Sequence, residues 1–374
     1  MIEIREVKTK KEVKQFIELP LKMYKGNPYF VPPLYMSEKV LFKKVNPYTS
    51  SCDTVYYLAY KDDVLVGRIS GIIQRDANEK WNRKRVRFIR FDSIDDQEVA
   101  NALFDAVRKW AKDKGMTEIC GPLGFNDLER EGLLVEGFDE LSTFEEQYNF
   151  PYYEKLILNY GFKQEVEWVE KQIRLPKNPD DVERIKRLSD LIAKKYHLRL
   201  VQEKSIGEFI KKHRENFFKL YENTYSELYG TCPIRREVED DILAGFNLLL
   251  TEENVIAVYN DKNEMVCFGL YLPSIAKAVQ PSGGRITPAA LFRVLRARKH
   301  GKVRDFAIIG VREDYRNCGV PAMLLKMAVE ALEQGKVEYY ETNLQLTTNL
   351  NILNLFNRFD ARLHKRRRSY LKSI

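Results

Sequence analysis

The sequence has few of the residues that build metal centres, disulfide frameworks or histidine-based triads. Its five cysteines contain no Cys-x-x-Cys pair, and its four histidines are scattered, at positions 52, 120, 232, 267 and 318 and at 197, 213, 300 and 364. Structural zinc sites need closely spaced ligands, and disulfide frameworks belong to oxidising compartments. We therefore expect no metal, no disulfide and a reducing, cytoplasmic location.

Long apolar runs are also missing. No run approaches the roughly 18 residues that a membrane span needs. The first residues, MIEIREVKTKKEVKQFI, alternate charged with apolar residues and lack the uninterrupted apolar core of a signal peptide. We expect no membrane partner.

What the chain does contain is typical of a globular protein. Hydrophobic residues make up 44% and charged residues 31% of its 374 residues, and 21 Tyr and 20 Phe can fill more than one core. The length predicts two or three domains. A net charge of +8 is modest, and it is compatible with an anionic small molecule or with nucleic acid.

The two halves of the chain show the same order of elements. The first half predicts strands and helices over 2–7, 10–24, 55–60, 64–73, 86–91, 97–114, 117–120, 152–160 and 162–173. The second half repeats that order over 198–202, 205–225, 255–259, 265–272, 304–311, 321–335, 337–344, 350–359 and 361–371. The offset of about 200 residues predicts a duplicated domain, with domains at 1–175 and 182–374 joined by a linker over Leu175–Asp181. The alternative is two unrelated α/β domains whose element orders coincide.

One strand-loop-helix segment, Phe306–Leu332, has the features of an anion-binding site. It places backbone N–H groups and a helix N-terminus around one point, which favours a phosphate. Gly319 allows close approach, and Pro321 suits the first helical turn. Arg316 and Arg312 add positive charge. The alternative is a plain strand-to-helix turn with a surface arginine.

This segment resembles the R-x-x-G-x-G/A signature of the GNAT superfamily of acyl-CoA N-acyltransferases, in which the loop cradles the pyrophosphate of coenzyme A. Arg316 and Gly319 match, whereas Pro321 stands where the family has Gly or Ala. The resemblance implies acetyl-CoA or another acyl-CoA as co-substrate. The residues it would place on the cofactor are Ile309, Gly310, Val311, Arg316, Asn317, Cys318, Gly319, Val320, Pro321, Ala322 and Asn349. It implies two α/β (α+β) domains, each a mixed, mostly antiparallel sheet flanked by helices.

A narrower resemblance, to a bacterial group of two-domain GNAT-like proteins of unestablished substrate, covers nearly the whole chain. It rests on YKGNP and FVPPL near the N-terminus and on GLLVEGF and PYY further along. The first half lacks the cofactor loop, because its fourth strand leads into Asp92, Asp95, Asp96 and Glu98 without a glycine. These carboxylates suit a helix cap and would repel a pyrophosphate.

Catalysis would need a base for the amine and a donor for the thioester carbonyl. By resemblance, a backbone N–H between Ile308 and Val311 polarises the carbonyl, and the usual tyrosine acid of the last helix is Phe356 here. Glu341 is the candidate base, sharing a strand face with Tyr339 and Asn343, and Tyr370 is a candidate acid. Alternatively, Glu341 is an ion-paired carboxylate of the strand and Tyr370 is a tyrosine packed in the core.

A long insertion and three basic stretches complete the candidates. The insertion, Gly121–Phe150, carries Asn126, Asp127, Glu129, Arg130 and Glu131, and its acidic bias suits a cationic amine acceptor, unless it is a lid without chemistry. Positive charge concentrates in the stretches 83–90, 293–304 and 364–368. The second, a predicted basic helix, could contact the 3′-phosphate of coenzyme A or meet RNA, and the alternative is a solvated face. An acyl-CoA-dependent N-acyltransferase of the N-acetyltransferase type, acting on an unidentified amine acceptor, is therefore expected. The alternatives are a non-catalytic GNAT-like binding module and an aminoacyl-tRNA-dependent transferase.

Overall fold

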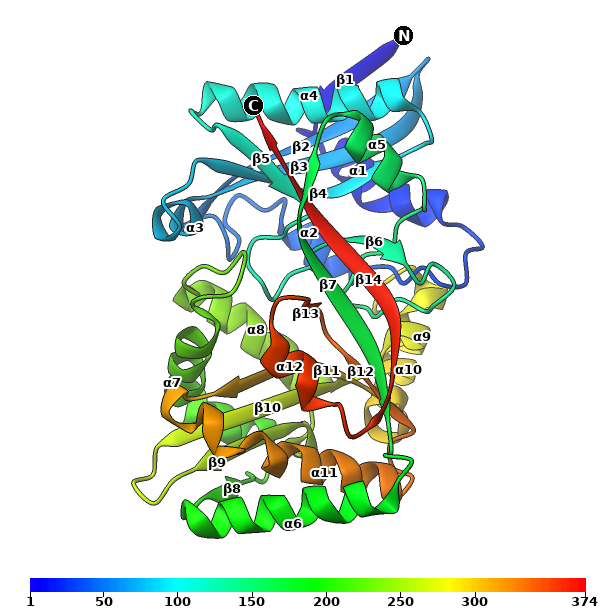
Figure 1. Ribbon diagram of the computed structural model, residues 1–374. Helices are drawn as coiled ribbons and strands as arrows, with labels where there is room; N and C mark the ends of the chain where they lie inside the picture. The colour runs from blue at the N-terminus through cyan, green and yellow to red at the C-terminus, as the bar shows by residue number, and fades with distance from the viewer.

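A computed structural model describes residues 1–374 and joins the strands of both halves into one 14-stranded sheet (Figure 1). The N-terminal half contains β1 (Ile2–Glu6), α1 (Lys10–Met23), α2 (Tyr35–Val40), β2 (Cys52–Lys61), β3 (Val64–Gln74), α3 (Arg75–Lys80), β4 (Arg85–Ser93), α4 (Gln97–Asp113), β5 (Glu118–Gly121), β6 (Leu133–Glu136), α5 (Tyr153–Asn159) and β7 (Lys163–Arg174). The C-terminal half contains α6 (Pro179–Lys195), β8 (Arg199–Val201), α7 (Ile206–Tyr225), α8 (Arg236–Leu249), η1 (Glu252–Asn254), β9 (Val255–Tyr259), β10 (Met265–Pro273), α9 (Ala276–Val279), η2 (Gln280–Ser282), α10 (Pro288–His300), β11 (Val303–Val311), η3 (Glu313–Cys318), α11 (Pro321–Glu333), β12 (Tyr339–Thr342), β13 (Gln345–Leu346), α12 (Leu350–Leu355) and β14 (Asp360–Ser373).

The predicted fold class is confirmed in both halves. Each half has an antiparallel meander followed by one parallel pair, β4 with β5 in the first and β11 with β12 in the second. The capping prediction for the first half is also confirmed, because the Asp96 carboxylate accepts from the backbone N–H of Glu98 at 2.9 Å. None of the helices combines the length and apolar character that crossing a bilayer requires.

The last strands of the two halves are exchanged. β14, the end of the C-terminal half, pairs with β5 of the N-terminal half, and β7, the end of the N-terminal half, pairs with β12 of the C-terminal half. Between them β7 and β14 form a long antiparallel pair that crosses the molecule, with Lys163 opposite Leu371 and Arg174 opposite Asp360 (Figure 1). Neither half completes its own sheet, so the two halves cannot separate without breaking strand pairing.

The exchanged pair carries complementary buried charges, acidic on β7 and basic on β14. The Glu170 carboxylate accepts from Arg367 Nε at 2.6 Å and from Lys365 Nζ at 3.3 Å, and all three side chains are almost inaccessible to solvent. Burial opposes the charge of Glu170, but Lys365 and Arg367 outweigh it and lower its pKa to about 2. Because the pairing is buried, it fixes which strand faces which.

The structure corrects the interpretation of two basic stretches as surface features. In 364–368, Lys365 and Arg367 lie inside the strand pair just described. In 83–90, Arg87 and Arg90 are buried, and Arg90 donates to Glu38 at 2.9 Å and 3.0 Å. These side chains already have partners, so the exposed basic side chains of the three stretches are Arg83, Lys84 and those of α10 and the residues after it.

One hydrophobic core spans both halves. It joins Tyr48 and Phe125 of the first half to Phe217 and Leu270 of the second within one cluster of 32 buried residues. The first half has its own core around α4, and the second has smaller clusters against α6 and α11. The shared core lies where the two halves meet, next to the candidate site.

Replacing Glu170 by Gln tests the charge pairing. The variant leaves Arg367 buried without its counter-ion and Lys365 with Glu341 alone, and we expect the free energy of unfolding at pH 7 to fall by about 3–5 kcal/mol. Urea denaturation measures it. The matched control is Glu136→Gln, whose side chain is 56% exposed and whose pair with Arg366 is 3.2 Å long, and exposed pairs contribute at most about 1 kcal/mol. Equal effects of the two changes would contradict the pairing's role.

Candidate functional site

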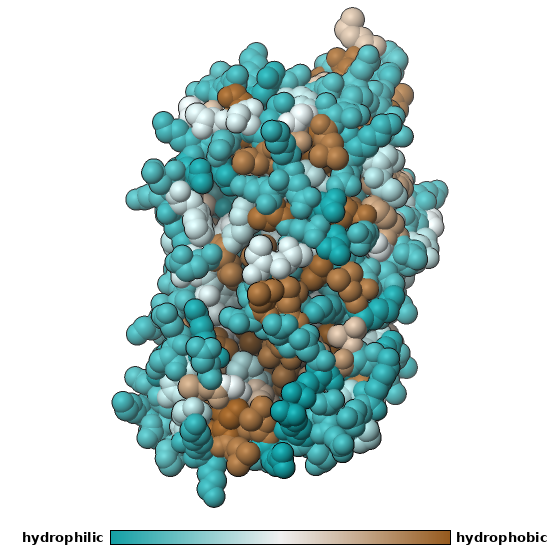
Figure 2. Space-filling model, viewed as in Figure 1, coloured by the Kyte–Doolittle hydropathy of each residue, from teal (hydrophilic) through white to brown (hydrophobic).

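A cavity of about 1440 Å³ lies between the two halves and is lined by residues from both. Small-molecule pockets usually measure roughly 300–1,000 Å³, so this one has room for a large ligand or for two. Hydrophobic side chains gather in the middle of the face shown in Figure 2, over the region where α12 and β13 lie in Figure 1. The cavity is therefore the first candidate for a functional site.

One end of the cavity is formed by the loop singled out in the sequence. After β11 the chain makes the 3₁₀ turn η3, and Gly319 then adopts a left-handed conformation (φ 75°) that lets α11 begin at Pro321. Four of its predicted residues line the cavity, namely Arg316, Gly319, Pro321 and Ala322. Asn317, Cys318 and Val320 do not, and Val320 is fully buried in the core.

The two arginines near this loop differ in availability. Arg316 is exposed and makes no ion pair or side-chain hydrogen bond, so its guanidinium can meet an anion at the helix N-terminus. Arg312 already donates to Asp314 at 2.7 Å and 2.9 Å and to Glu264 at 3.0 Å. None of the residues of α10 lines the cavity.

The edge of β11 forms the middle of the cavity. β12 pairs with β11 only as far as Phe306, so the edge beyond it has no strand partner. Ile308, Ile309 and Val311 line the cavity there. Gly310 does not line it, and it faces Phe268, with which a side chain at that position would collide. Asn349, the N-cap of α12, also lines the cavity.

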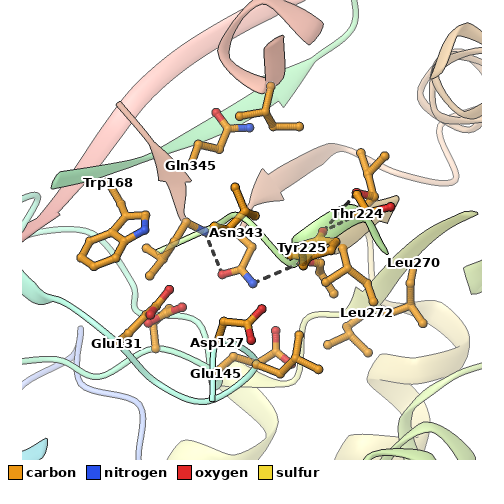
Figure 3. Close-up of a pocket in the computed structure, with 18 of the residues that line it drawn as sticks. Asp127, Glu131, Glu145, Trp168, Thr224, Tyr225, Leu270, Leu272, Asn343 and Gln345 are labelled. Carbon is orange, nitrogen blue, oxygen red and sulfur yellow. Dashed lines mark hydrogen bonds between the residues drawn. The ribbon is translucent and has the colours of Figure 1, made fainter. Parts of the chain in front are cut away.

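Two side chains cap the open edge of β11. The Ile309 backbone N–H donates to the Tyr225 hydroxyl at 3.2 Å, and that hydroxyl lies 3.1 Å from the Ile309 carbonyl oxygen. The Asn343 amide donates to the Ala307 carbonyl at 3.3 Å (Figure 3). The donor that the sequence predicted for a thioester carbonyl is thus already directed at a hydroxyl inside the cavity. A linear ligand lying along this edge would replace the Tyr225 contact.

The far end of the cavity is acidic and comes from the insertion of the N-terminal half. The carboxylates of Asp127, Glu131 and Glu145 lie on the side of the cavity opposite Asn343 (Figure 3). Asp127 accepts from the Tyr221 hydroxyl at 2.5 Å. Burial raises the pKa of Asp127 and of Glu131 above their usual range, and it raises the pKa of Glu145 to about 7.

The two candidate catalytic residues lie outside the cavity. Glu341 is 6% exposed, forms an ion pair with Lys365, and lies 3.4 Å from His364 Nε2. Tyr370 is buried in the core of the N-terminal half, where its hydroxyl donates to Glu154 at 2.6 Å. The exchange of β14 explains this position, because it carries Tyr370 into the other half. Their catalytic roles stay predictions without a geometric basis.

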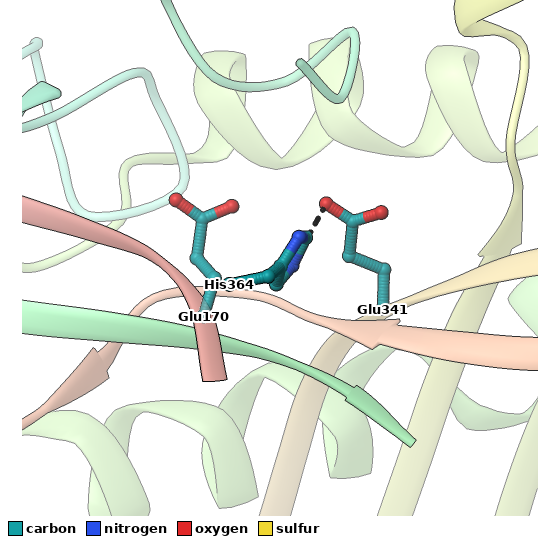
Figure 4. Close-up of side chains that lie close together, drawn as sticks. All are labelled: Glu170, Glu341 and His364. Atoms are coloured by element: carbon teal, nitrogen blue, oxygen red, sulfur yellow. Dashed lines mark ion pairs between the residues drawn. The ribbon is translucent and has the colours of Figure 1, made fainter. Parts of the chain in front are cut away.

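Three side chains of metal-ligand type meet on the exchanged strands. Ligand atoms of Glu170, Glu341 and His364 lie within 4.8 Å of one another (Figure 4). The Lys365 ammonium contacts both carboxylates, so a cation already occupies the space between them. The cluster is explained by strand pairing.

Comparison with known proteins places this geometry in a fold family. No family model matches the chain. It is 26% identical over 380 residues to Protein YghO of Escherichia coli, covering 99% of this chain and 95% of that protein. It is 36% identical over 135 residues to the bacterial ceramide synthase of Caulobacter vibrioides, covering 36% of this chain and 35% of that protein.

Solved structures with the same architecture include a tandem GNAT protein from the clavulanic acid biosynthesis pathway. Its TM-score is 0.59 at 10% identity, with 100% of this chain and 98% of that chain covered. A GCN5-related N-acetyltransferase from Sphaerobacter thermophilus gives a TM-score of 0.52 at 8% identity, covering 100% and 95%. The chain therefore has the fold of the tandem GNAT proteins.

Several residues of the cavity were not found from the sequence. Tyr225 and Asn343 were assigned only to a helix end and to a strand face. Glu145 lies inside the insertion but was not among its named residues. Tyr225 is the last residue of a helix and Glu145 lies in a loop without a motif, so no local pattern marks either. Only the packing of α7 and of the insertion against β11 brings them together.

The hydroxyl of Tyr225 can be tested by a Tyr225→Phe variant. The variant removes both hydrogen bonds between the hydroxyl and the Ile309 backbone, at about 1 kcal/mol each, so we expect the free energy of unfolding to fall by about 1–2 kcal/mol. It should also speed amide hydrogen exchange at Ile309, which loses its acceptor. Exchange measured by NMR checks this, with Tyr271→Phe as the control because its hydroxyl bonds to Glu253. Unchanged exchange at Ile309 would show that the hydroxyl does not protect this edge.

Proposed function

We propose that the protein is an acyl-CoA-dependent N-acyltransferase that joins a long acyl chain to an amine. One observation carries the proposal: a single cavity runs from the loop with free Arg316, past the open edge of β11, to a wall of carboxylates. An anionic cofactor, a linear thioester and a cationic acceptor would each find a complementary part of it.

The loop end supports coenzyme A as the donor. The α11 N-terminus and the unpaired Arg316 would hold the pyrophosphate, with Gly319 allowing close approach. Pro321 supplies no N–H, but the first amides of a helix need not all bind the ligand. Asn349 and the β11 edge at Ile309 and Val311 would lie along the pantetheine.

The reaction follows from these positions. The amine nitrogen attacks the thioester carbonyl carbon, the C–N bond forms, and the C–S bond breaks with its electron pair going to sulfur. An alkylammonium and an acyl-CoA thus give an amide, free coenzyme A thiol and one proton. The Ile309 N–H, released from Tyr225, would polarise the carbonyl oxygen.

The size and lining of the cavity favour a long acyl chain over acetyl. Its apolar wall includes Leu270, Leu272 and Ile308, and its volume exceeds what an acetyl thioester would fill. A ceramide is an amide of a fatty acid with a long-chain amino alcohol. The partial likeness to a bacterial ceramide synthase therefore supports the same type of bond, formed here on an amine that the fold does not identify.

An RNA-dependent transferase has less support. The basic stretch 293–304 that favoured it belongs to α10 and the residues after it, and none of its residues lines the cavity. A non-catalytic acyl-CoA-binding module is the remaining alternative, and a measurement of acyl transfer distinguishes it from an enzyme.

The donor site predicts binding of one palmitoyl-CoA per chain in calorimetric titration. Arg316→Ala should weaken it about tenfold, because one charge-assisted contact is lost. Gly319→Glu should abolish it by placing a carboxylate among the phosphate donors. The matched control is Arg312→Ala, whose guanidinium is held by Asp314 and Glu264, and it should change affinity less than threefold.

Binding of neither palmitoyl-CoA nor acetyl-CoA to the wild type would overturn the proposed function. Because a side chain at Gly319 would approach Ile192 Cδ1 to 2.7 Å and strain the left-handed turn, the Arg316 and Arg312 pair decides the result if the glycine variant unfolds.

A further inference from the structure

The insertion of the N-terminal half brings several carboxylates without partners to one wall of the cavity. Glu131 is 8% exposed, lines the cavity, and receives no hydrogen bond or ion pair. Asp127 Oδ1 and Glu146 Oε2 are buried without a hydrogen-bond partner. Glu145 also lines the cavity and is likewise unpaired. Figure 3 shows Asp127, Glu131 and Glu145 around one space.

The positive groups near this wall are already engaged. Arg87 donates to the carbonyls of Gly124 at 3.0 Å and Gly230 at 2.7 Å. Arg130 donates to the Phe144 carbonyl at 2.6 Å. Arg90 pairs with Glu38 and lies 3.6 Å from Glu129. No lysine of the chain lines the cavity.

Buried anions without counter-ions are costly, so such groups hold a proton until a cation arrives. The pKa of Glu131 is raised by burial and then by the neighbouring Asp127 and Glu146, with Arg87 opposing. Burial raises the pKa of Glu145 to about 7 against the pull of Arg130, and Asp305 of β11 faces the same group. Arg90 and Arg130 line the same cavity, but neither forms an ion pair with Glu131 or Glu145, and the apolar side chains of Leu270 and Leu272 also line it.

We propose that Asp127, Glu131 and Glu145 form the subsite for the ammonium group of a primary alkylamine, so that the N-terminal half supplies the acceptor site of a reaction whose donor binds to the C-terminal half. This inference rests on the proposed function and adds the acceptor class and its location. Binding of R–NH3⁺ ionises the carboxylates and releases their protons to solvent. With acyl-CoA in place, one carboxylate takes one proton from the ammonium, and the free amine attacks.

The subsite explains why the N-terminal half keeps the fold without a cofactor loop of its own. Its insertion reaches across the shared core to the edge of β11, where Asn343 and Tyr225 face it. The Tyr221 hydroxyl, one turn before Tyr225 on α7, holds Asp127 in place. A substrate amine between these carboxylates would lie beside the thioester carbonyl.

Calorimetric titration of octylamine into the wild-type chain tests the subsite, with 1-octanol as the neutral probe of equal length. We expect one octylamine per chain and release of at least about half a proton, measured by comparing phosphate with Tris buffer at pH 7.5. Octanol should bind at least tenfold more weakly than octylamine, and its binding should release no protons. Octylamine affinity should rise between pH 6 and 9, because the carboxylates lose their protons while an alkylammonium, with a pKa near that of lysine at about 10.4, stays charged.

The variants Glu131→Gln and Glu145→Gln keep the side-chain shape and should each weaken octylamine at least tenfold and reduce proton release. Their affinity for palmitoyl-CoA should stay within twofold of the wild type. Glu136→Gln, a β6 carboxylate that does not line the cavity, is the matched control and should leave both ligands unaffected.

Equal affinity for octylamine and octanol, or amine binding without proton release, would overturn the subsite. These two wild-type measurements decide the matter even if a variant fails to fold. Palmitoyl-CoA binding without octylamine binding would remove the subsite and keep the proposed function. Octylamine binding with proton release but no acyl-CoA binding would keep the subsite and remove the proposed function.

Discussion

The antiparallel pairing of β7 with β14 is the constraint on which the rest of the structure depends. Each strand completes the sheet of the half to which it does not belong, and the buried contacts of Glu170 with Lys365 and Arg367 match acidic to basic strand. A buried ion pair contributes little to the net free energy of folding, but leaving one of its charges unpaired is strongly destabilising. The pairing therefore specifies how the halves meet more than it adds to their cohesion.

This fixed junction creates a cavity that neither half forms alone. The C-terminal half contributes the loop before α11, with Arg316 and Gly319, and the open edge of β11. The N-terminal half contributes the carboxylates of its insertion. On the proposed function the two halves divide two tasks, with donor recognition in the C-terminal half and acceptor recognition in the N-terminal half. The different residues that follow β4 and β11 are consistent with that division.

Much of this could be predicted from the sequence, because local patterns carry it. The apolar runs of β3 and β10 after polar turns, the cap at Asp96 and the glycine before α11 all determine structure within a few residues. The strand exchange could not be predicted, because the order of elements along the chain is the same whether β14 pairs within its own half or with the N-terminal half. For that reason the sequence predicts Tyr370 as a candidate acid of the site, although β14 carries it into the core of the N-terminal half. Tyr225 and Glu145 reach the cavity through long-range packing, which no local signal records.

The most direct test of the account is a turnover measurement with both ligands present. Wild-type chain, palmitoyl-CoA and octylamine would be incubated together, with thiol release followed by absorbance and the amide quantified by mass spectrometry. The account predicts N-octylpalmitamide and free coenzyme A in equal amounts, with little thiol released when octanol replaces the amine. No amide, under conditions where both ligands bind, would contradict it and identify the chain as a binding module.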